Sequence, residues 1–252
     1  MKEYRSSIVP FVEEAGVALA ESFGKVEAVA FKSSPTDLVT ELDRKTEQFL
    51  ADRFKKLYPD IDFFGEEFGG NDKAERFWLV DPIDGTNQFI RGNPFATTMV
   101  SLIESGQVVF ALIYNFITKE MCVAEKGKGA TMNGEPIHVS GRDFQRAEVG
   151  FETNLKKKEN GEKFLAVAAK CSIIRTHNSG YEHLLVATGR MEARACLDPS
   201  GKDWDYAPGS LLVSEAGGIV RNLGSGSYDF RNHDFIAGNP IVFEELRKIL
   251  EG

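Results

Sequence analysis

The sequence predicts a layered α/β protein, and three features of its 252 residues indicate this class. Hydrophobic residues make up 42% of the chain and charged residues 27%, a balance typical of folded proteins and unlike disordered or low-complexity chains. Segments with helical periodicity alternate with short β-branched and aromatic runs. No linker-like stretch interrupts them, so we expect two fused lobes, residues 1–145 and 146–252, that form one catalytic unit.

The charge balance and the cysteines exclude several classes of partner. Lysine and arginine total 30 against 38 acidic residues, giving a net charge of −8, so we expect no nucleic-acid or membrane binding. Cys122, Cys171 and Cys196 have neither disulfide-framework nor metal-site spacing. The amino terminus has no apolar secretion segment and no long apolar window follows, which indicates a cytoplasmic protein.

The first half should contain two helices followed by strands. Apolar residues at helical spacing predict helices over residues 8–23 and 40–57, the second opening with a capping box. Residues 77–80 form a buried strand that should end before Asp81. Residues 97–123 are rich in β-branched and aromatic residues with two turn signals, which predicts consecutive hairpins.

The second half should alternate helices with strands. Predicted helices cover residues 164–170, 181–188 and 206–216, and predicted strands cover 173–174, 192–197 and 218–221. A strand at 235–237 precedes Asn239 as N-cap and a helix ending near Leu250. His183 lies within an apolar helical pattern and should be packed rather than catalytic.

The acidic motif Asp81-Pro82-Ile83-Asp84-Gly85-Thr86 is the most informative segment. Asp81 and Asp84 straddle a proline that stiffens the chain, so both carboxylates can face one hard cation. Gly85 and Thr86 could open a helix whose free N–H groups hold a phosphate oxygen. Spacing alone is equally compatible with a surface turn.

Two further acidic residues are candidates for the same site as this motif. Glu66 follows the apolar run 61–64 and sits at a predicted strand end, where an acidic residue is commonly part of a solvated turn. Asp205 begins an apolar helix and could be an ordinary N-cap.

Together these segments resemble the inositol monophosphatase family of magnesium-dependent, lithium-sensitive sugar phosphatases. The resemblance covers most of the chain and keeps the family's order. It rests on Lys32-Ser33-Ser34-Pro35-Thr36-Asp37-Leu38-Val39-Thr40 with Asp43, Gly65-Glu66-Glu67, Asp81 to Thr86, and Trp204-Asp205 with Glu215-Ala216-Gly217-Gly218. It implies an α/β/α/β/α sandwich of the sugar-phosphatase type with mixed sheets, and a homodimer.

The resemblance also implies a metal site. Two or three Mg²⁺ ions, for which Mn²⁺ can substitute, would be held by Glu66, Asp81, the Ile83 carbonyl, Asp84 and Asp205. Four converging carboxylates would repel one another without cations, and all-oxygen ligands favour Mg²⁺ or Mn²⁺ over zinc.

The implied reaction is attack of a metal-activated water on phosphorus without a covalent intermediate. Glu66, Thr86 and Asp43 are the candidates to orient or deprotonate that water, and the amides of Gly85 and Thr86 would bind phosphate. Asp43 could instead serve only in the capping box of its helix.

Substrate contacts are implied at Ser179, Gly180 and Asp198, where the chain departs from the family pattern. Asp198 replaces a longer Glu, so the choice of alcohol stays open. Lys32 and Asp37 resemble the family's mobile loop, although Lys32 could be only a solvated side chain.

These features predict a phosphatase of small polyol monophosphates, with inositol monophosphate first. Fructose 1,6-bisphosphate, histidinol phosphate and 3'-phosphoadenosine 5'-phosphate are alternatives, as is a non-catalytic cation or phosphate-binding regulator. A second phosphate would need an extra cationic pocket, and the sequence shows no obvious Arg or Lys cluster for one, although Arg175 or Arg190 could contribute.

Overall fold

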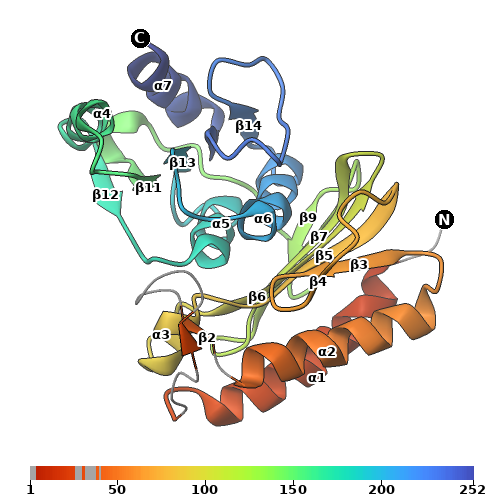
Figure 1. Cartoon of the computed structure of the whole chain (residues 1–252). Helices are drawn as coiled ribbons and strands as arrows, with labels where there is room; N and C mark the ends of the chain where they lie inside the picture. The colour runs from red at the N-terminus through yellow and green to blue at the C-terminus, as the bar shows by residue number, and fades with distance from the viewer. Residues whose placement is uncertain (1–3, 26–29, 32–37, 40) are drawn as a thin grey trace.

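The chain folds into five layers, seen edge-on in the computed structural model of Figure 1, which describes residues 4–25, 30–31, 38–39 and 41–252. Helices α1 and α2 cover one face of an eight-stranded sheet, α5 and α6 fill the space between the two sheets, and α4 and α7 cover the outer face of a five-stranded sheet. The helices are α1 (Tyr4–Ser22), α2 (Glu41–Leu57), α3 (Thr86–Ile90), α4 (Lys158–Ala168), α5 (Ser179–Ala187), α6 (Asp203–Glu215) and α7 (Pro240–Glu251), with a 3-10 turn at Phe144–Arg146. The predicted α/β/α/β/α sandwich is confirmed.

The larger sheet is mixed and has the strand order β10-β9-β8-β7-β6-β5-β3-β4. Its strands are β3 (Asp62–Gly65), β4 (Gly69–Gly70), β5 (Arg76–Asp84), β6 (Thr97–Glu104), β7 (Gln107–Asn115), β8 (Glu120–Glu125), β9 (Ala130–Met132) and β10 (Glu135–Pro136). The predicted hairpins are β6 to β8, and β3 pairs with β5 in parallel. Strands β1 (Ala30–Phe31) and β2 (Leu38–Val39) form a separate pair.

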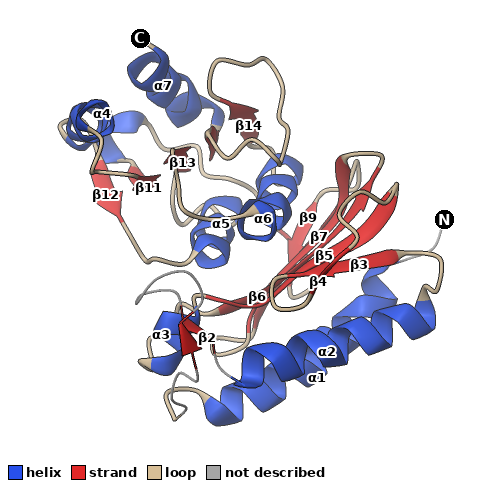
Figure 2. Ribbon diagram, viewed as in Figure 1, coloured by secondary structure: helices blue, strands red, loops and turns tan. Residues whose placement is uncertain are grey.

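The smaller sheet has the order β12-β11-β13-β15-β14. Its strands are β11 (Glu148–Thr153), β12 (Ser172–Ile174), β13 (Ala193–Leu197), β14 (Ile219–Asn222) and β15 (Phe235–Gly238). Strand β11 is parallel to both β12 and β13, so the carboxyl ends of these three strands share one edge. Figure 2 shows this sheet separated from the larger one by α5 and α6.

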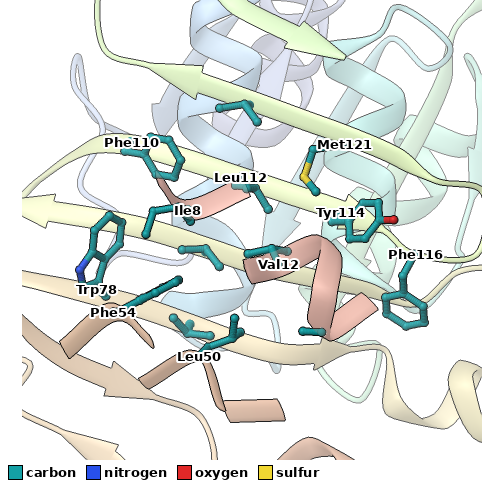
Figure 3. Close-up of a cluster of buried hydrophobic side chains, with 14 of the residues drawn as sticks. Ile8, Val12, Leu50, Phe54, Trp78, Phe110, Leu112, Tyr114, Phe116 and Met121 are labelled. Carbon is teal, nitrogen blue, oxygen red and sulfur yellow. The ribbon is translucent and has the colours of Figure 1, made fainter. Parts of the chain in front are cut away.

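Apolar side chains of α1 and α2 bury the outer face of the larger sheet. Figure 3 shows Ile8 and Val12 from α1 with Leu50 and Phe54 from α2 against the strands, where Trp78 lies fully buried. A second apolar cluster joins α5 and α6 to both sheets, and a third lies under α4 and α7. The site described below therefore rests on a rigid frame.

Some predicted boundaries differ from the observed ones. Helix α4 begins at Lys158 rather than near residue 164, because its polar first turns carry no apolar periodicity. Strand β11 has no counterpart among the predictions, since Glu148 and Glu152 interrupt its apolar run. Among the described residues, none of the helices combines the length and apolar character needed to cross a bilayer.

Candidate active site

Three carboxylates that are distant in the sequence converge between the two sheets. Asp81 and Asp84 belong to β5, and Asp205 lies in the first turn of α6. One oxygen from each residue lies within 4.8 Å of the others. Asp81 and Asp84 are only 2% and 5% exposed, so little water screens their charges. The structure thus brings together three of the side chains predicted as metal ligands.

A bulge in β5 places both of its aspartates on one side. The strand does not end at Val80 as predicted, because its ladder with β6 continues to Asp84. Asp81 and Asp84 are three positions apart on β5, whereas their partners on β6, Met99 and Thr97, are two positions apart. This extra residue compensates the two-residue alternation of a strand, so the two side chains share a face. Pro82 donates no N–H, and the N–H of Ile83 is donated to Oδ1 of Asp81 over 3.0 Å.

Glu66 lies beside Asp81 because their strands are parallel neighbours. It directly follows β3, and its N–H donates to the carbonyl of Val80 over 3.1 Å. Burial raises the pKa of Asp81 well above its usual range, and the carboxylates of Glu66, Asp84 and Asp205 raise it further. The predicted fourth carboxylate therefore contributes to the same negative field.

Asp84 is held by the amino-terminal end of α5. Its Oδ2 accepts the N–H of Gly180, and its carbonyl accepts the side-chain amide of Asn178. Burial raises the pKa of Asp84 to about 7 although the Gly180 hydrogen bond favours the ionised form. The hydroxyl of Ser179 donates to the carbonyl of Asp205. Ser179 and Gly180, predicted as substrate contacts, therefore tie α5 to both aspartates.

Asp205 caps its own helix from the third helical position. Its Oδ2 accepts the N–H of Lys202 over 2.6 Å, and its own N–H donates to the Lys202 carbonyl over 3.0 Å. The N-cap is Lys202, so the alternative that Asp205 is an ordinary N-cap is wrong. Burial and the nearby Asp84 and Glu66 raise the pKa of Asp205 well above its usual range.

The hydroxyl of Thr86 connects the acidic motif to α2. It lies 2.9 Å from Oδ1 of the fully buried Asp43 and 3.0 Å from the Ile83 carbonyl, and its single proton can serve either acceptor. Gly85 is the N-cap of the predicted short helix α3, with φ of 82°. A Cβ there would lie 2.4 Å from the side-chain nitrogen of Asn178, so only glycine fits.

A cavity of about 570 Å³ opens beside the acidic cluster. Asp84, Asp205 and Ser179 line it together with Asp198, the third residue predicted as a substrate contact beside Ser179 and Gly180. The Asp198 carboxylate forms an ion pair with Nζ of Lys157 at 2.8 Å, and this ion pair lowers its pKa. The predicted loop residues Lys32 and Asp37 lie outside the described residues.

Sequence reasoning missed a buried ionic network in the cavity wall. Arg194 on β13 donates to Glu152 on β11 over 2.6 Å and also to Glu182 on α5. Arg194 is 2% exposed. Each of two short apolar runs contains a charged residue, and this was the signal available in the sequence. Nothing in the sequence indicates that these charged residues form ion pairs.

The oxygen ligands of the acidic cluster fit a hard divalent cation. Three carboxylates this close and this buried cannot all be ionised near neutral pH without a compensating positive charge. Oxygen-only ligands are the preference of Mg²⁺ and Mn²⁺.

The five layers and this acidic cluster define a metal-dependent phosphoric monoester hydrolase. Residues 1–251 match the model of the inositol monophosphatase family. The chain therefore belongs to the inositol monophosphatase family, whose members are enzymes that act on small phosphate esters.

Several relatives match along nearly the whole chain. An inositol-1-monophosphatase of Rhizobium meliloti is 32% identical over 97% of this chain and 94% of its own. A fructose-1,6-bisphosphatase/inositol-1-monophosphatase of Thermotoga maritima is 29% identical over 96% of this chain and 93% of its own. The crystal structure of the extragenic suppressor protein suhB of Bartonella henselae superposes with a TM-score of 0.90, at 29% identity and 99% coverage of each chain.

Proposed function

We propose that the protein is a Mg²⁺-dependent phosphatase of small polyol and sugar phosphate monoesters, with inositol monophosphate as the leading substrate. The observation that carries this proposal is the convergence of Asp81, Asp84 and Asp205 within 4.8 Å. The names of the relatives support it, because they include inositol-1-monophosphatases and a fructose-1,6-bisphosphatase/inositol-1-monophosphatase.

The proposed metal ligands are Glu66, Asp81, the Ile83 carbonyl, Asp84 and Asp205. Two or three Mg²⁺ ions, or Mn²⁺ in their place, would be held there and would supply the positive charge that neutralises phosphate oxygens and acidifies water. The Ile83 carbonyl has two lone pairs, so it can accept from Thr86 and still present oxygen to a cation.

Thr86 and Asp43 are proposed to orient the attacking water. When Asp43 accepts the hydroxyl proton of Thr86, the Thr86 oxygen keeps lone pairs that can accept a hydrogen bond from water. Glu66, beside Asp81, is the further candidate to take up a proton. The N–H groups of Gly85 and Thr86 would bind phosphate oxygens.

Ser179, Gly180 and Asp198 are proposed to shape the alcohol side of the site. Gly180 admits no side chain, because a Cβ would lie 2.3 Å from the Thr97 hydroxyl. The mobile-loop role of Lys32 and Asp37 and the division at residue 145 remain proposals. So do a cytoplasmic homodimer and the absence of nucleic-acid partners.

A substrate panel with purified protein tests the proposal. Phosphate release from inositol 1-phosphate and β-glycerophosphate should require Mg²⁺, and Asp84→Asn should lower kcat by about a thousandfold or more. The matched control is Asp52→Asn, an exposed aspartate on α2, which should stay within about twofold of the unmodified protein.

Two outcomes contradict the proposal. Unchanged turnover in Asp84→Asn would place the chemistry elsewhere. Absence of Mg²⁺-dependent release from all monoesters and from the bisphosphate and histidinol phosphate alternatives would favour the non-catalytic regulator.

A further inference from the structure

The cavity beside the acidic cluster also presents basic side chains that the hydrolysis of a monoester does not use. Lys156, Arg175 and His177 line the same cavity as Asp84 and Asp205. All three residues are exposed, so the ends of their side chains can meet a ligand from solvent. We call these three residues the basic wall.

The topology of the smaller sheet explains why the basic wall forms. Lys156 follows the carboxyl end of β11, and Arg175 and His177 follow that of β12. The two strands are parallel neighbours, so the loops leave the sheet at one edge. Ligand sites of α/β sheets form outside this edge.

Ion pairing distinguishes Lys156 and Arg175 from other charged residues at the cavity. Glu152 and Glu182 are paired with Arg194, and Asp198 is paired with Lys157. Within the part of the chain that the structure describes, Lys156 and Arg175 have no carboxylate partner of this kind.

The unpaired charges that remain are therefore of two kinds. Asp84 and Asp205 belong to the proposed metal site, whose cations would neutralise the phosphate that is cleaved. A neutral polyol needs hydrogen bonds rather than two permanent cations. An anionic group elsewhere on the substrate would match both Lys156 and the planar guanidinium of Arg175.

Resting on the proposed function, we propose that the basic wall binds a second anionic group of the substrate. The preferred substrate is then a phosphate monoester whose alcohol carries a further phosphate or carboxylate. Arg190, the other candidate cation named from the sequence, instead pairs with Glu120 at 2.8 Å.

Matched substrate pairs test this inference. Fructose 1-phosphate and fructose 1,6-bisphosphate differ by a phosphate, and glucitol 6-phosphate and 6-phosphogluconate differ by a carboxylate. In at least one pair, the member with the extra anion should have a KM about tenfold lower at low salt, and the difference should shrink as salt is added. Which pair responds identifies the anionic group.

Variants assign the effect to the basic wall. In the double variant Lys156→Ala/Arg175→Ala, the KM ratio of the responding pair should fall to within about twofold of one. The control is Lys158→Ala, which removes a nearby exposed charge that pairs with Glu162 at 3.6 Å. This control should keep the ratio of the unmodified protein.

Failure of the inference is distinguishable from failure of the proposed function. Release from the monophosphates with KM ratios near one in both pairs overturns the inference alone, as does a ratio unchanged in the double variant. If no substrate releases phosphate, the affinities of the same substrate pairs, measured by calorimetry, test the inference instead. Tighter binding of the member with the extra anion, lost in the double variant, supports the basic wall, and equal or undetectable binding overturns it.

Discussion

Arg194 and Glu152 form a partly buried ion pair, 2.6 Å between guanidinium nitrogen and carboxylate oxygen, that joins the two parts of the site. Glu152 also accepts the hydroxyl of Tyr206 on α6 at 3.2 Å. The same guanidinium binds Glu182, which accepts the N–H of Thr176 at 2.9 Å just before α5. One cation thus connects the loop that holds Asp84 with the helix that carries Asp205.

Replacing this cation should destabilise the protein strongly. Arg194→Met leaves the buried carboxylate of Glu182 and the partly buried carboxylate of Glu152 without their cation, so the free energy of unfolding should fall by about 3–5 kcal/mol in urea denaturation. Adding Glu182→Gln should restore part of the loss, because one buried charge is removed. Arg190→Met, which breaks a more exposed ion pair, should cost less than about 1 kcal/mol. Equal losses in the two arginine variants would contradict this role.

The Thr86 hydroxyl should matter for turnover more than for stability. Thr86→Ala removes the group between Asp43 and the proposed water, and we expect kcat to fall by about 10²–10³-fold with a smaller change in KM. Thr86→Ser keeps the hydroxyl and should retain most of the rate. Steady-state kinetics on inositol 1-phosphate measures both. Similar rates for the alanine and serine variants would exclude a role for the hydroxyl.

Gly85 should tolerate no side chain, and Gly127 offers a matched comparison. Both have left-handed backbones, with φ of 82° and 75°. A Cβ at Gly85 would lie 2.4 Å from Asn178, whereas one at Gly127 meets nothing within 4 Å. Gly127→Ala should cost about 1 kcal/mol through its backbone alone, and Gly85→Ala should cost at least about 1 kcal/mol more. Thermal or urea unfolding gives both values, and equal costs would show that the close approach is unimportant.

His183 should make the protein less stable at mildly acidic pH. As predicted, it is fully buried, and its ring stacks on that of Phe235 with 6.0 Å between the ring centroids. Burial lowers its pKa to about 3 from an ordinary 6.5. The unfolded chain therefore binds the proton first, and this contribution to stability is complete above pH 6.5 and is lost as the pH falls.

Between pH 7 and pH 5 the loss from His183 should be about 2 kcal/mol. The variant His183→Phe keeps a ring at this position but cannot titrate. Urea midpoints for both proteins at pH 7, 6 and 5 isolate the histidine, because other titrating groups are common to both. Parallel pH profiles would mean that His183 does not contribute.

Much of the fold could be predicted because its signals are local. The apolar stripe of α1 and the Asn239-Pro240 start of α7 lie within single elements, and the structure confirms both. The pairing of Arg194 with Glu152 and Glu182 could not be predicted, because adjacent strands and a separate helix bring these residues together. Buried ion pairs leave no periodic signal in the sequence.

The sequence by itself determined the class of elements, the layered α/β fold and the family, since hydrophobic periodicity and short acidic motifs are local properties of the chain. Only the tertiary structure decided that a bulge puts Asp81 and Asp84 on one face, and that Lys156 and Arg175 share a cavity with Asp84 and Asp205. These relations depend on strand register and on which loops leave the same edge of a sheet. Register and loop placement are fixed by packing between the layers, over distances that local patterns do not encode.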